Sequence, residues 1–287
     1  FPTKEAKLTG EEIHKRLDEI EEIHGLYSPV KLGFAAALAC SAFTFLLGGG
    51  PVEMILAFIA AGIGNFIRTK LIKHHYTLFL NIAASISAAC LVYALLLKLS
   101  EVCFGISSFH EAGYICSMLF IIPGFPFITS GIDLAKLDLR SGLERLTYAI
   151  IIVLVATMFA WIMALLLKLK PVDFAAMNID PILHMFLRII TSFSIMFNSA
   201  IPIAATAALI GAAANTLRLE LIDFTQMPSA EAAFIGALTA GLLASIIKRN
   251  HGYPRISITV PSIVIMVPGL YLYRGFYNLG IMSLATS

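Results

Sequence analysis

The chain has 287 residues, of which 59% are hydrophobic and only 13% are charged. Soluble domains carry about 25% charged residues, so this composition excludes an ordinary soluble protein and predicts one that crosses a membrane several times. The net charge of +2, without a basic cluster interleaved with aromatic residues, excludes a nucleic-acid partner. A soluble helical enzyme with an apolar core is the alternative, but the stretch 149–167, "AIIIVLVATMFAWIMALLL", has no polar face.

An amphipathic helix is predicted first, over residues 8–23, "LTGEEIHKRLDEIEEI". Its isoleucine and leucine residues recur at helical spacing, and Thr9 followed by Glu12 resembles a capping box. We expect residues 1–28 to form a cytoplasmic segment that packs on the rest of the protein or on a part that precedes it. Because the chain starts at Phe1 and shows no signal peptide, we expect a fragment or a processed product.

Nine membrane spans follow, separated by charged residues or by glycine and proline. After them, the segment 275–287, "GFYNLGIMSLATS", is too short to span alone and is either half of a tenth span or the start of one. The nine predicted spans cover residues 30–47, 52–67, 77–97, 112–133, 146–167, 182–198, 202–217, 229–247 and 256–273.

Lys and Arg are distributed unevenly over the connections between these spans. With the N-terminus in the cytoplasm, 14 of the 20 Lys and Arg fall on the inner side, 5 fall on the outer side, and Arg188 lies within a span. Cytoplasmic loops are the ones enriched in these residues. The N-terminus is therefore predicted to be cytoplasmic.

Landmarks recur in the same order in the two halves of the chain. The stretch "GNFIRTKL" closes the second span with Asn65 and Arg68, and "ANTLRLEL" closes the seventh with Asn215 and Arg218. A proline begins each of these two spans. Further along, "FIIPGFPFITSG" in the fourth span matches "IMVPGLYLYRG" in the ninth.

The spacing of these landmarks predicts an inverted repeat. Corresponding landmarks lie five spans apart, and because five is odd, the two halves face opposite ways across the membrane. Secondary transporters are built in this way, with substrate sites near the midplane at broken helices. We therefore predict an all-α polytopic membrane protein with nine to ten transmembrane helices, arranged as two inverted five-helix repeats over 29–175 and 176–287, with broken helices at Pro123-Gly124 and Pro268-Gly269.

The stretch 121–133, "IIPGFPFITSGID", interrupts the fourth span. Pro123 and Pro126 lack the N–H groups that would bond the carbonyls of Leu119 and Ile122, so we expect these carbonyls to be released. Pro123 lies eleven residues from the outer end of the span, or roughly 17 Å at 1.5 Å per residue. Two such breaks could hold a zwitterion, with its amino group on carbonyls and its carboxylate at a helix N-terminus. The alternative is a kink that only shapes helix packing.

Polar side chains near the breaks are the candidates for binding protons and substrate. Asp133 follows the first break with Thr129 on the same helical face, and a carboxylate inside a span can carry protons or bind an ammonium group. If the helix stays regular, Asp133 lies instead near the cytoplasmic interface, solvated or paired with Arg140 or Arg145. Glu231, near the outer end of the eighth span, is the matching candidate.

Two asparagines of the repeat, Asn65 and Asn215, can equally contact a ligand or join neighbouring helices by hydrogen bonds. Enzymatic chemistry finds no support, because no Ser/His/Asp set, metal-ligand spacing or phosphate loop is present. Asp133 and Asp138 do not face each other as the two carboxylates of an aspartyl hydrolase must. We expect no enzyme activity, cofactor or metal, and we expect the four cysteines to be small buried hydrophobes: Cys40, Cys90, Cys103 and Cys116.

Three long stretches, "HKRLDEIEEIHGLYSPVKLGFAAALACSAFTFLLGGG", "IIPGFPFITSGIDLAKLDLRSGLERL" and "ITVPSIVIMVPGLYLYRGFYNLG", resemble the threonine/serine exporter (ThrE-type) family of inner-membrane transporters. The first half resembles the larger domain of that family. The part from Ile182 resembles the smaller domain, which some bacteria carry as a separate subunit. The most specific pattern, P-G-x-P…D…D…G…R, maps onto Pro123, Gly124, Pro126, Asp133, Asp138, Gly142 and Arg145.

The resemblance implies export of small hydroxy amino acids, threonine or serine, coupled to proton entry. On this hypothesis Asp133 and Glu231 couple protons, while Asp138 and Arg145 are structural polar residues. The partners are then the amino acid, protons and the lipid bilayer, with a homo-oligomer left open. A channel or scaffold component of a larger assembly is the alternative function. The residues expected to contact substrate are Pro123, Gly124, Pro126, Thr129, Asn65, Asn215, Pro268 and Gly269.

Overall fold

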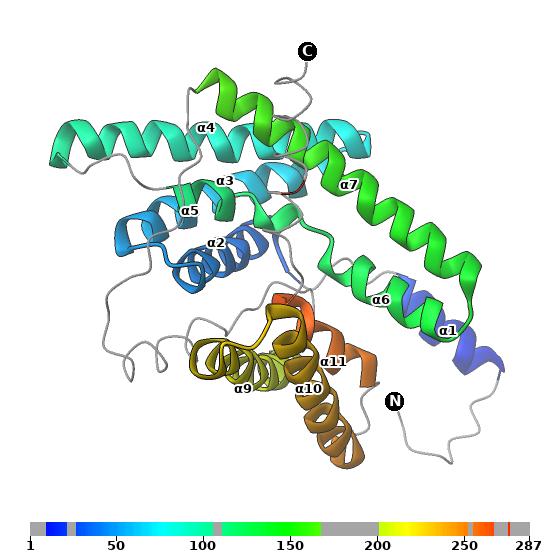
Figure 1. Cartoon of the computed structure of the whole chain (residues 1–287). Coiled ribbons are helices and arrows are strands. Elements are labelled where there is room, and N and C mark those ends of the chain that lie inside the picture. Colours follow the sequence, from blue (N-terminus) through cyan, green and yellow to red (C-terminus); the bar gives the residue numbers. More distant parts are fainter. Residues whose placement is uncertain are drawn as a thin grey trace.

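The computed structural model describes residues 10–21, 27–105, 111–167, 201–251, 255–266 and 275, and every regular element within them is a helix (Figure 1). Helices suit a chain this apolar, because a helix satisfies its own backbone hydrogen bonds in lipid. In chain order, with η for a 3-10 helix, the elements are α1 (Gly10–Glu21), α2 (Pro29–Leu46), α3 (Pro51–Lys73), α4 (Leu78–Phe104), α5 (Glu111–Cys116), η1 (Leu119–Ile121), α6 (Gly124–Ala135), α7 (Leu139–Leu166), α9 (Ile201–Thr225), α10 (Ser229–His251), α11 (Arg255–Ile263) and η2 (Val264–Met266).

Six of the described helices are long and apolar enough to cross a membrane, and the bent pair Gly113–Ile121 and Gly124–Ala135 is a seventh candidate. They coincide with the first five predicted spans and with the seventh and eighth. The prediction of a multi-pass, all-helical membrane protein is therefore confirmed. The sixth predicted span, the end of the ninth and nearly all of the tenth lie outside the described residues.

Some helices extend beyond the predicted spans. Helix α3 continues to Lys73 rather than ending at Ile67, and α7 begins at Leu139 rather than at Leu146. Apolar length identifies only the part of a helix that meets hydrocarbon, whereas the charged turns beyond it continue the same helix toward water. The predicted spans were therefore shorter than the helices that contain them.

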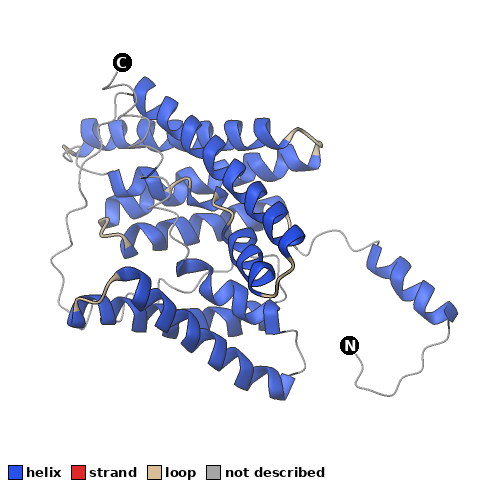
Figure 2. Cartoon of the chain, turned by 45° about the vertical axis from the view of Figure 1, so that its right-hand side comes forward, coloured by secondary structure: helices blue, strands red, loops and turns tan. Residues whose placement is uncertain are grey.

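The predicted amphipathic helix is present as α1, and Figure 2 shows it apart from the helical bundle. Its apolar side chains Ile13 and Leu17 are exposed. The packing that we expected for this face is therefore not seen in the described residues. The residue expected to cap the helix, Thr9, lies outside them.

Small residues allow α2 and α3 to pack closely. A Cβ added to Gly33 of α2 would lie 3.1 Å from the carbonyl oxygen of Gly62 in α3. A Cβ added to Gly62 would in turn lie 3.2 Å from the Cβ of Ala37. Membrane helices associate through such contacts, because close approach of the backbones increases van der Waals packing.

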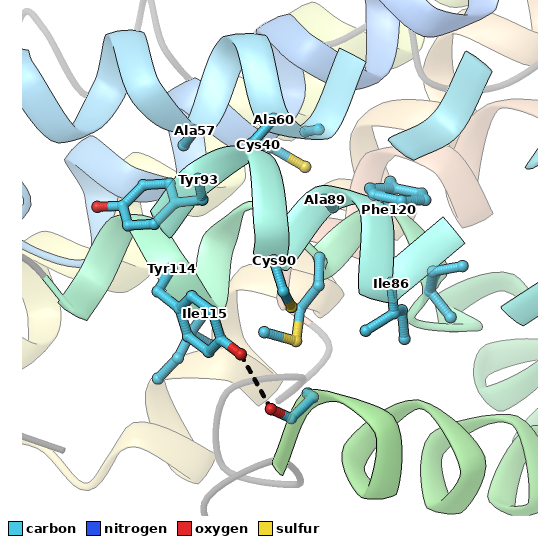
Figure 3. Close-up of a cluster of buried hydrophobic side chains, with 14 of the residues drawn as sticks. Cys40, Ala57, Ala60, Ile86, Ala89, Cys90, Tyr93, Tyr114, Ile115 and Phe120 are labelled. Atoms are coloured by element: carbon cyan, nitrogen blue, oxygen red, sulfur yellow. Dashed lines mark hydrogen bonds between the residues drawn. The ribbon is translucent and has the colours of Figure 1, made fainter. Parts of the chain in front are cut away.

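A buried core joins α4, α5 and α7 (Figure 3). Tyr93 of α4 is fully buried, and its ring packs edge to face on Tyr114 of α5, with the ring centroids 6.1 Å apart. The Tyr114 hydroxyl donates to the carbonyl of Ala160 in α7 at 2.9 Å. Helix α5 is thus held to both neighbours just before the chain turns into η1.

A second group consists of α9, α10 and α11, packed largely through alanine. The hydroxyl of the buried Ser262 in α11 lies 2.9 Å from the carbonyl of Ala207 in α9 and 2.7 Å from the carbonyl of Ile258. Gly211 permits this approach, because a Cβ there would lie 2.9 Å from the Ser262 carbonyl oxygen.

The two groups meet through α6, which contacts both α11 and η2. The helix that follows the first break therefore lies against the segment that leads to Pro268.

Gly64 of α3 provides a test of this packing, because a Cβ there would lie 2.8 Å from the Phe120 ring and 2.9 Å from the Cβ of Ala89. We expect Gly64→Ala to lower the free energy of unfolding by about 1–3 kcal/mol, since α3 must move away from η1 and α4. Gly131→Ala in α6 is the matched control, because nothing lies within 4 Å of its Cβ. Denaturant unfolding in detergent measures both, and equal stability of the two variants would contradict the packing.

Candidate functional site

The fourth span is broken at Ile122 and Pro123, between η1 and α6. The helix axis bends by 58° from Gly113–Ile121 to Gly124–Ala135. Gentle curvature does not produce such an angle, and sharp changes of this kind occur at proline. The structure therefore has a broken helix at the predicted Pro-Gly pair.

The carbonyls that we expected this break to release are bonded, which corrects the prediction. The Leu119 carbonyl accepts from the N–H of Ile122 at 3.1 Å, and the Ile122 carbonyl accepts from the N–H of Gly124 at 2.8 Å. Tight turns of this kind satisfy groups that a proline ring leaves without a helical partner. Pro126 lies in the first turn of α6, where an N–H would have no partner within the helix.

A side chain from another helix binds a second carbonyl of η1. The guanidinium Nη1 of Arg68 in α3 donates to the carbonyl of Phe120 at 3.2 Å. Arg68 is partly buried, and Tyr148 of α7 is its electrostatic neighbour. A cation within a candidate span thus lies at the break, in contact with the backbone that the proline interrupts.

Two buried hydroxyl groups, Thr129 and Ser130, lie on α6. The Thr129 hydroxyl lies 3.0 Å from the Phe125 carbonyl and 3.2 Å from the Pro126 carbonyl, and the Ser130 hydroxyl donates to the Phe127 carbonyl at 2.8 Å. Their protons are therefore used within the helix. The oxygen lone pairs of both groups can still accept hydrogen bonds.

Helices α6 and α7 form a hairpin whose close contacts involve residues of the P-G-x-P…D…D…G…R pattern. Asp138 caps α7, because its carboxylate accepts from the backbone N–H of Ser141 at 3.3 Å. A Cβ on Gly142 would lie 2.7 Å from the side chain of Leu134, so glycine at this position allows α7 to approach α6.

Asp133 and Arg145 form an ion pair across this hairpin. Arg145 Nη1 lies 2.9 Å from Asp133 Oδ2, and the two side chains are 51% and 21% exposed, respectively. Arg140 pairs instead with Glu144 on its own helix. Of the environments that the sequence left open for Asp133, pairing with Arg145 is therefore the one observed. Asp133 lies near the C-terminal end of α6, away from the break at its start.

A 3-10 helix precedes Pro268, as one precedes Pro123. The 3-10 helix η2 ends two residues before Pro268, as η1 ends two residues before Pro123. The buried serines Ser117 and Ser262 each lie six residues before the corresponding proline. The correspondence of these two serines is present in the sequence, but the sequence analysis did not identify it. Pro268 and Gly269 themselves lie outside the described residues.

The remaining predicted site residues lie on other helices. The side chain of Asn65 donates to the carbonyl of Leu32 at 3.0 Å and so joins α3 to α2. Asn215 is buried within α9, and Glu231 is exposed in the first turn of α10. The break at Pro123, with Arg68, Thr129 and Ser130, is therefore the candidate site that the described residues define.

Glu53 carries a buried carboxylate, but the sequence analysis did not include it among the candidate site residues. It is 6% exposed, and its Oε2 accepts from the N–H of Gly50 at the start of α3. The sequence feature that could have identified it is an isolated acidic residue two positions after Pro51, the proline at which the span begins. Its hydrogen bond is that of a helix cap.

The cysteines follow the prediction at three of four positions. Cys40, Cys90 and Cys116 are buried, but Cys103 is exposed, because it lies in the last turn of α4. Within the described part of the chain, no group of three or more His, Cys, Asp or Glu side chains gathers as a metal site would require.

Two family models cover most of the chain. The model described as "Putative threonine/serine exporter" matches residues 3–168, and the model described as "Threonine/Serine exporter, ThrE" matches residues 182–287. No solved structure matches the chain.

Curated relatives match part of the chain. "Probable succinate transporter subunit YjjP" of Escherichia coli (strain K12) is 28% identical over 153 residues, which are 53% of this chain and 57% of the relative. The protein of the same name in Klebsiella aerogenes is 26% identical over 158 residues, which are 55% of this chain and 58% of the relative. The match thus spans little more than half the length of these relatives. Because the first model alone covers more than half of the chain, the protein belongs to the threonine/serine exporter family, which is a family of transporters.

Proposed function

We propose that this protein is a secondary active transporter of the inner membrane that exports threonine or serine in exchange for protons. The observation that carries the proposal is the contact of α6 with α11 and η2, which joins the two halves of the chain next to their Pro-Gly segments. Secondary transporters bind substrate where broken helices of two repeats meet. Membership of a transporter family supports the same function.

Two inverted repeats, over residues 29–175 and 176–287, are part of this proposal. The equal spacing from η1 and η2 to their prolines supports the repeat, as do the matching positions of Ser117 and Ser262. The five-span offset between corresponding landmarks supports the inversion, because five is odd. The excess of Lys and Arg supports a cytoplasmic N-terminus. The relatives are named as subunits, which favours an assembly of more than one chain.

Small carboxylate-bearing molecules are the proposed substrate class. The family descriptions name threonine and serine, and the relatives are named for succinate, so a carboxylate is common to all three. Thr129 is the best placed of the proposed contacts, because its buried oxygen can accept a hydrogen bond from an ammonium or hydroxyl group. The other proposed contacts are Pro123, Gly124, Pro126, Asn65, Asn215, Pro268 and Gly269.

Proton coupling is assigned to Asp133. The ionised carboxylate attracts Arg145 across the α6–α7 hairpin at 2.9 Å, and protonation removes most of that attraction. The other end of α6 begins at the break, so a change at Asp133 alters the hold on a helix that reaches both the break and the second half of the chain. Glu231 is the matching candidate in the second repeat.

Efflux from liposomes tests the function. Vesicles that contain the purified protein are loaded with labelled threonine or serine, and the outside medium is acidified. We expect proton entry to accelerate efflux severalfold. Asp133→Asn should abolish this acceleration but retain exchange of labelled for unlabelled amino acid, because only the proton site is removed. Asp138→Asn is the matched control and should stay coupled, because asparagine also caps a helix well.

The proposal is wrong if neither amino acid leaves faster under the gradient. It is equally wrong in its mechanism if Asp133→Asn remains coupled like the parent protein. A channel would give flux that does not respond to a counter-gradient, and a scaffold would give none.

Thiol labelling tests the inverted repeat. His74, just after α3, and Thr225, at the end of α9, are both exposed. In a Cys103→Ser background the remaining cysteines are buried, so a membrane-impermeant maleimide reports only an introduced thiol. We expect Thr225→Cys to react in intact cells and His74→Cys to react only after permeabilisation. Native Cys103, at the predicted outer end of α4, is the positive control for the outside. Reaction of both introduced thiols from one side would refute the inversion.

A further inference from the structure

Arg68 is a cation within a candidate membrane span, and among the described residues it forms no ion pair with a carboxylate. It lies 17 residues after Pro51, or about 25 Å along α3 at 1.5 Å per residue. A hydrocarbon core is about 30 Å thick, so this position falls within or at the inner margin of the core. A charged side chain is costly there, and such residues mark the pathways of substrates or ions.

One hydrogen bond fixes this charge at the break. Arg68 Nη1 donates to the carbonyl of Phe120, three residues before Pro123, and the Phe120 ring is itself buried against α3 and α4. A guanidinium group has five N–H donors. Among the described residues the Phe120 carbonyl is its one hydrogen-bond acceptor, and no carboxylate pairs with it. Within the described part of the chain, the other four N–H groups have no acceptor and are available to a ligand.

The N-terminus of α6 is a poor alternative for binding an anion. The N–H of Gly124 is already bonded to the Ile122 carbonyl at 2.8 Å, and Pro126 has no N–H. Of the first three residues of α6, only Phe125 therefore offers a backbone donor. A carboxylate at this break needs another positive group, and Arg68 is the cation that the structure places beside it.

We propose that Arg68 binds the carboxylate of the transported molecule. The inference rests on the proposed function and names the chemical group that its substrates share. A guanidinium suits this role better than an ammonium, because it offers two parallel N–H donors to the two carboxylate oxygens. The Phe120 carbonyl orients the guanidinium, so the binding group moves together with the break.

Calorimetric binding to the purified protein in lipid nanodiscs tests the inference. The ligands are threonine, serine, succinate and threoninol, in which a hydroxymethyl group replaces the carboxylate of threonine. The native protein should bind threonine at least tenfold more tightly than threoninol. Arg68→Gln should weaken threonine binding roughly ten- to a hundredfold and leave threoninol binding unchanged. Glutamine keeps an N–H donor for the Phe120 carbonyl, so this variant separates loss of charge from loss of position.

Lys70→Gln is the matched control, because it removes the same charge from the same helix. Lys70 is exposed, and its ammonium lies 4.8 Å from the ring centroid of Phe66. Its binding constants should equal those of the native protein. If Arg68→Gln does not fold, Arg68→Lys decides the question. Weaker threonine binding with unchanged threoninol binding supports the site, and unchanged threonine binding overturns it.

Other results of the same experiments also test the inference. Equal affinity of the native protein for threonine and threoninol overturns the inference. An equal loss of affinity for both ligands in Arg68→Gln also overturns it, because it would indicate a structural role for Arg68. A protein that binds none of the three carboxylates has no such site. A protein that binds them but does not move them under a pH gradient retains the site and refutes the transport proposal.

Discussion

An interrupted backbone within a candidate membrane span is the constraint on which the rest of this structure depends. Each N–H and carbonyl at the break has to find a partner without water. The carbonyls of Leu119 and Ile122 are bonded locally, by the N–H groups of Ile122 and Gly124, whereas the carbonyl of Phe120 is bonded by Arg68, 52 residues away in sequence. The break therefore determines where α3 lies as well as where α6 begins.

Helix α3 holds the break at two points one turn apart. Gly64 leaves room for the ring of Phe120, and Arg68 bonds the carbonyl of the same residue. The two contacts depend on each other, because a larger residue at Gly64 would push η1 away from the guanidinium. Lipid provides no hydrophobic drive between helices, so this fit of small against large residues supplies much of the attraction.

The hairpin of α6 and α7 continues the chain from the break. Its family-pattern residues serve as a cap at Asp138, a close contact at Gly142 and an ion pair between Asp133 and Arg145. Their observed contacts hold two helices together, and the cationic group at the break comes from outside the pattern. In the proposed transport cycle, α6 links a titratable pair at one end to a substrate site at the other.

The sequence by itself determined the features that depend on solvent and on local chemistry. Lipid requires long apolar helices, so composition and apolar length predicted a multi-pass helical protein. Proline lacks an N–H wherever it lies, so the break at Pro123 was also predictable. The tertiary structure alone decided which groups bond the backbone carbonyls at the break, and which carboxylates are buried or paired. Arg68 meets Phe120, Asp133 meets Arg145, and Glu53 is buried because small residues set which helix faces approach one another. Such contacts join residues that are distant along the chain, and no local pattern records which faces will meet.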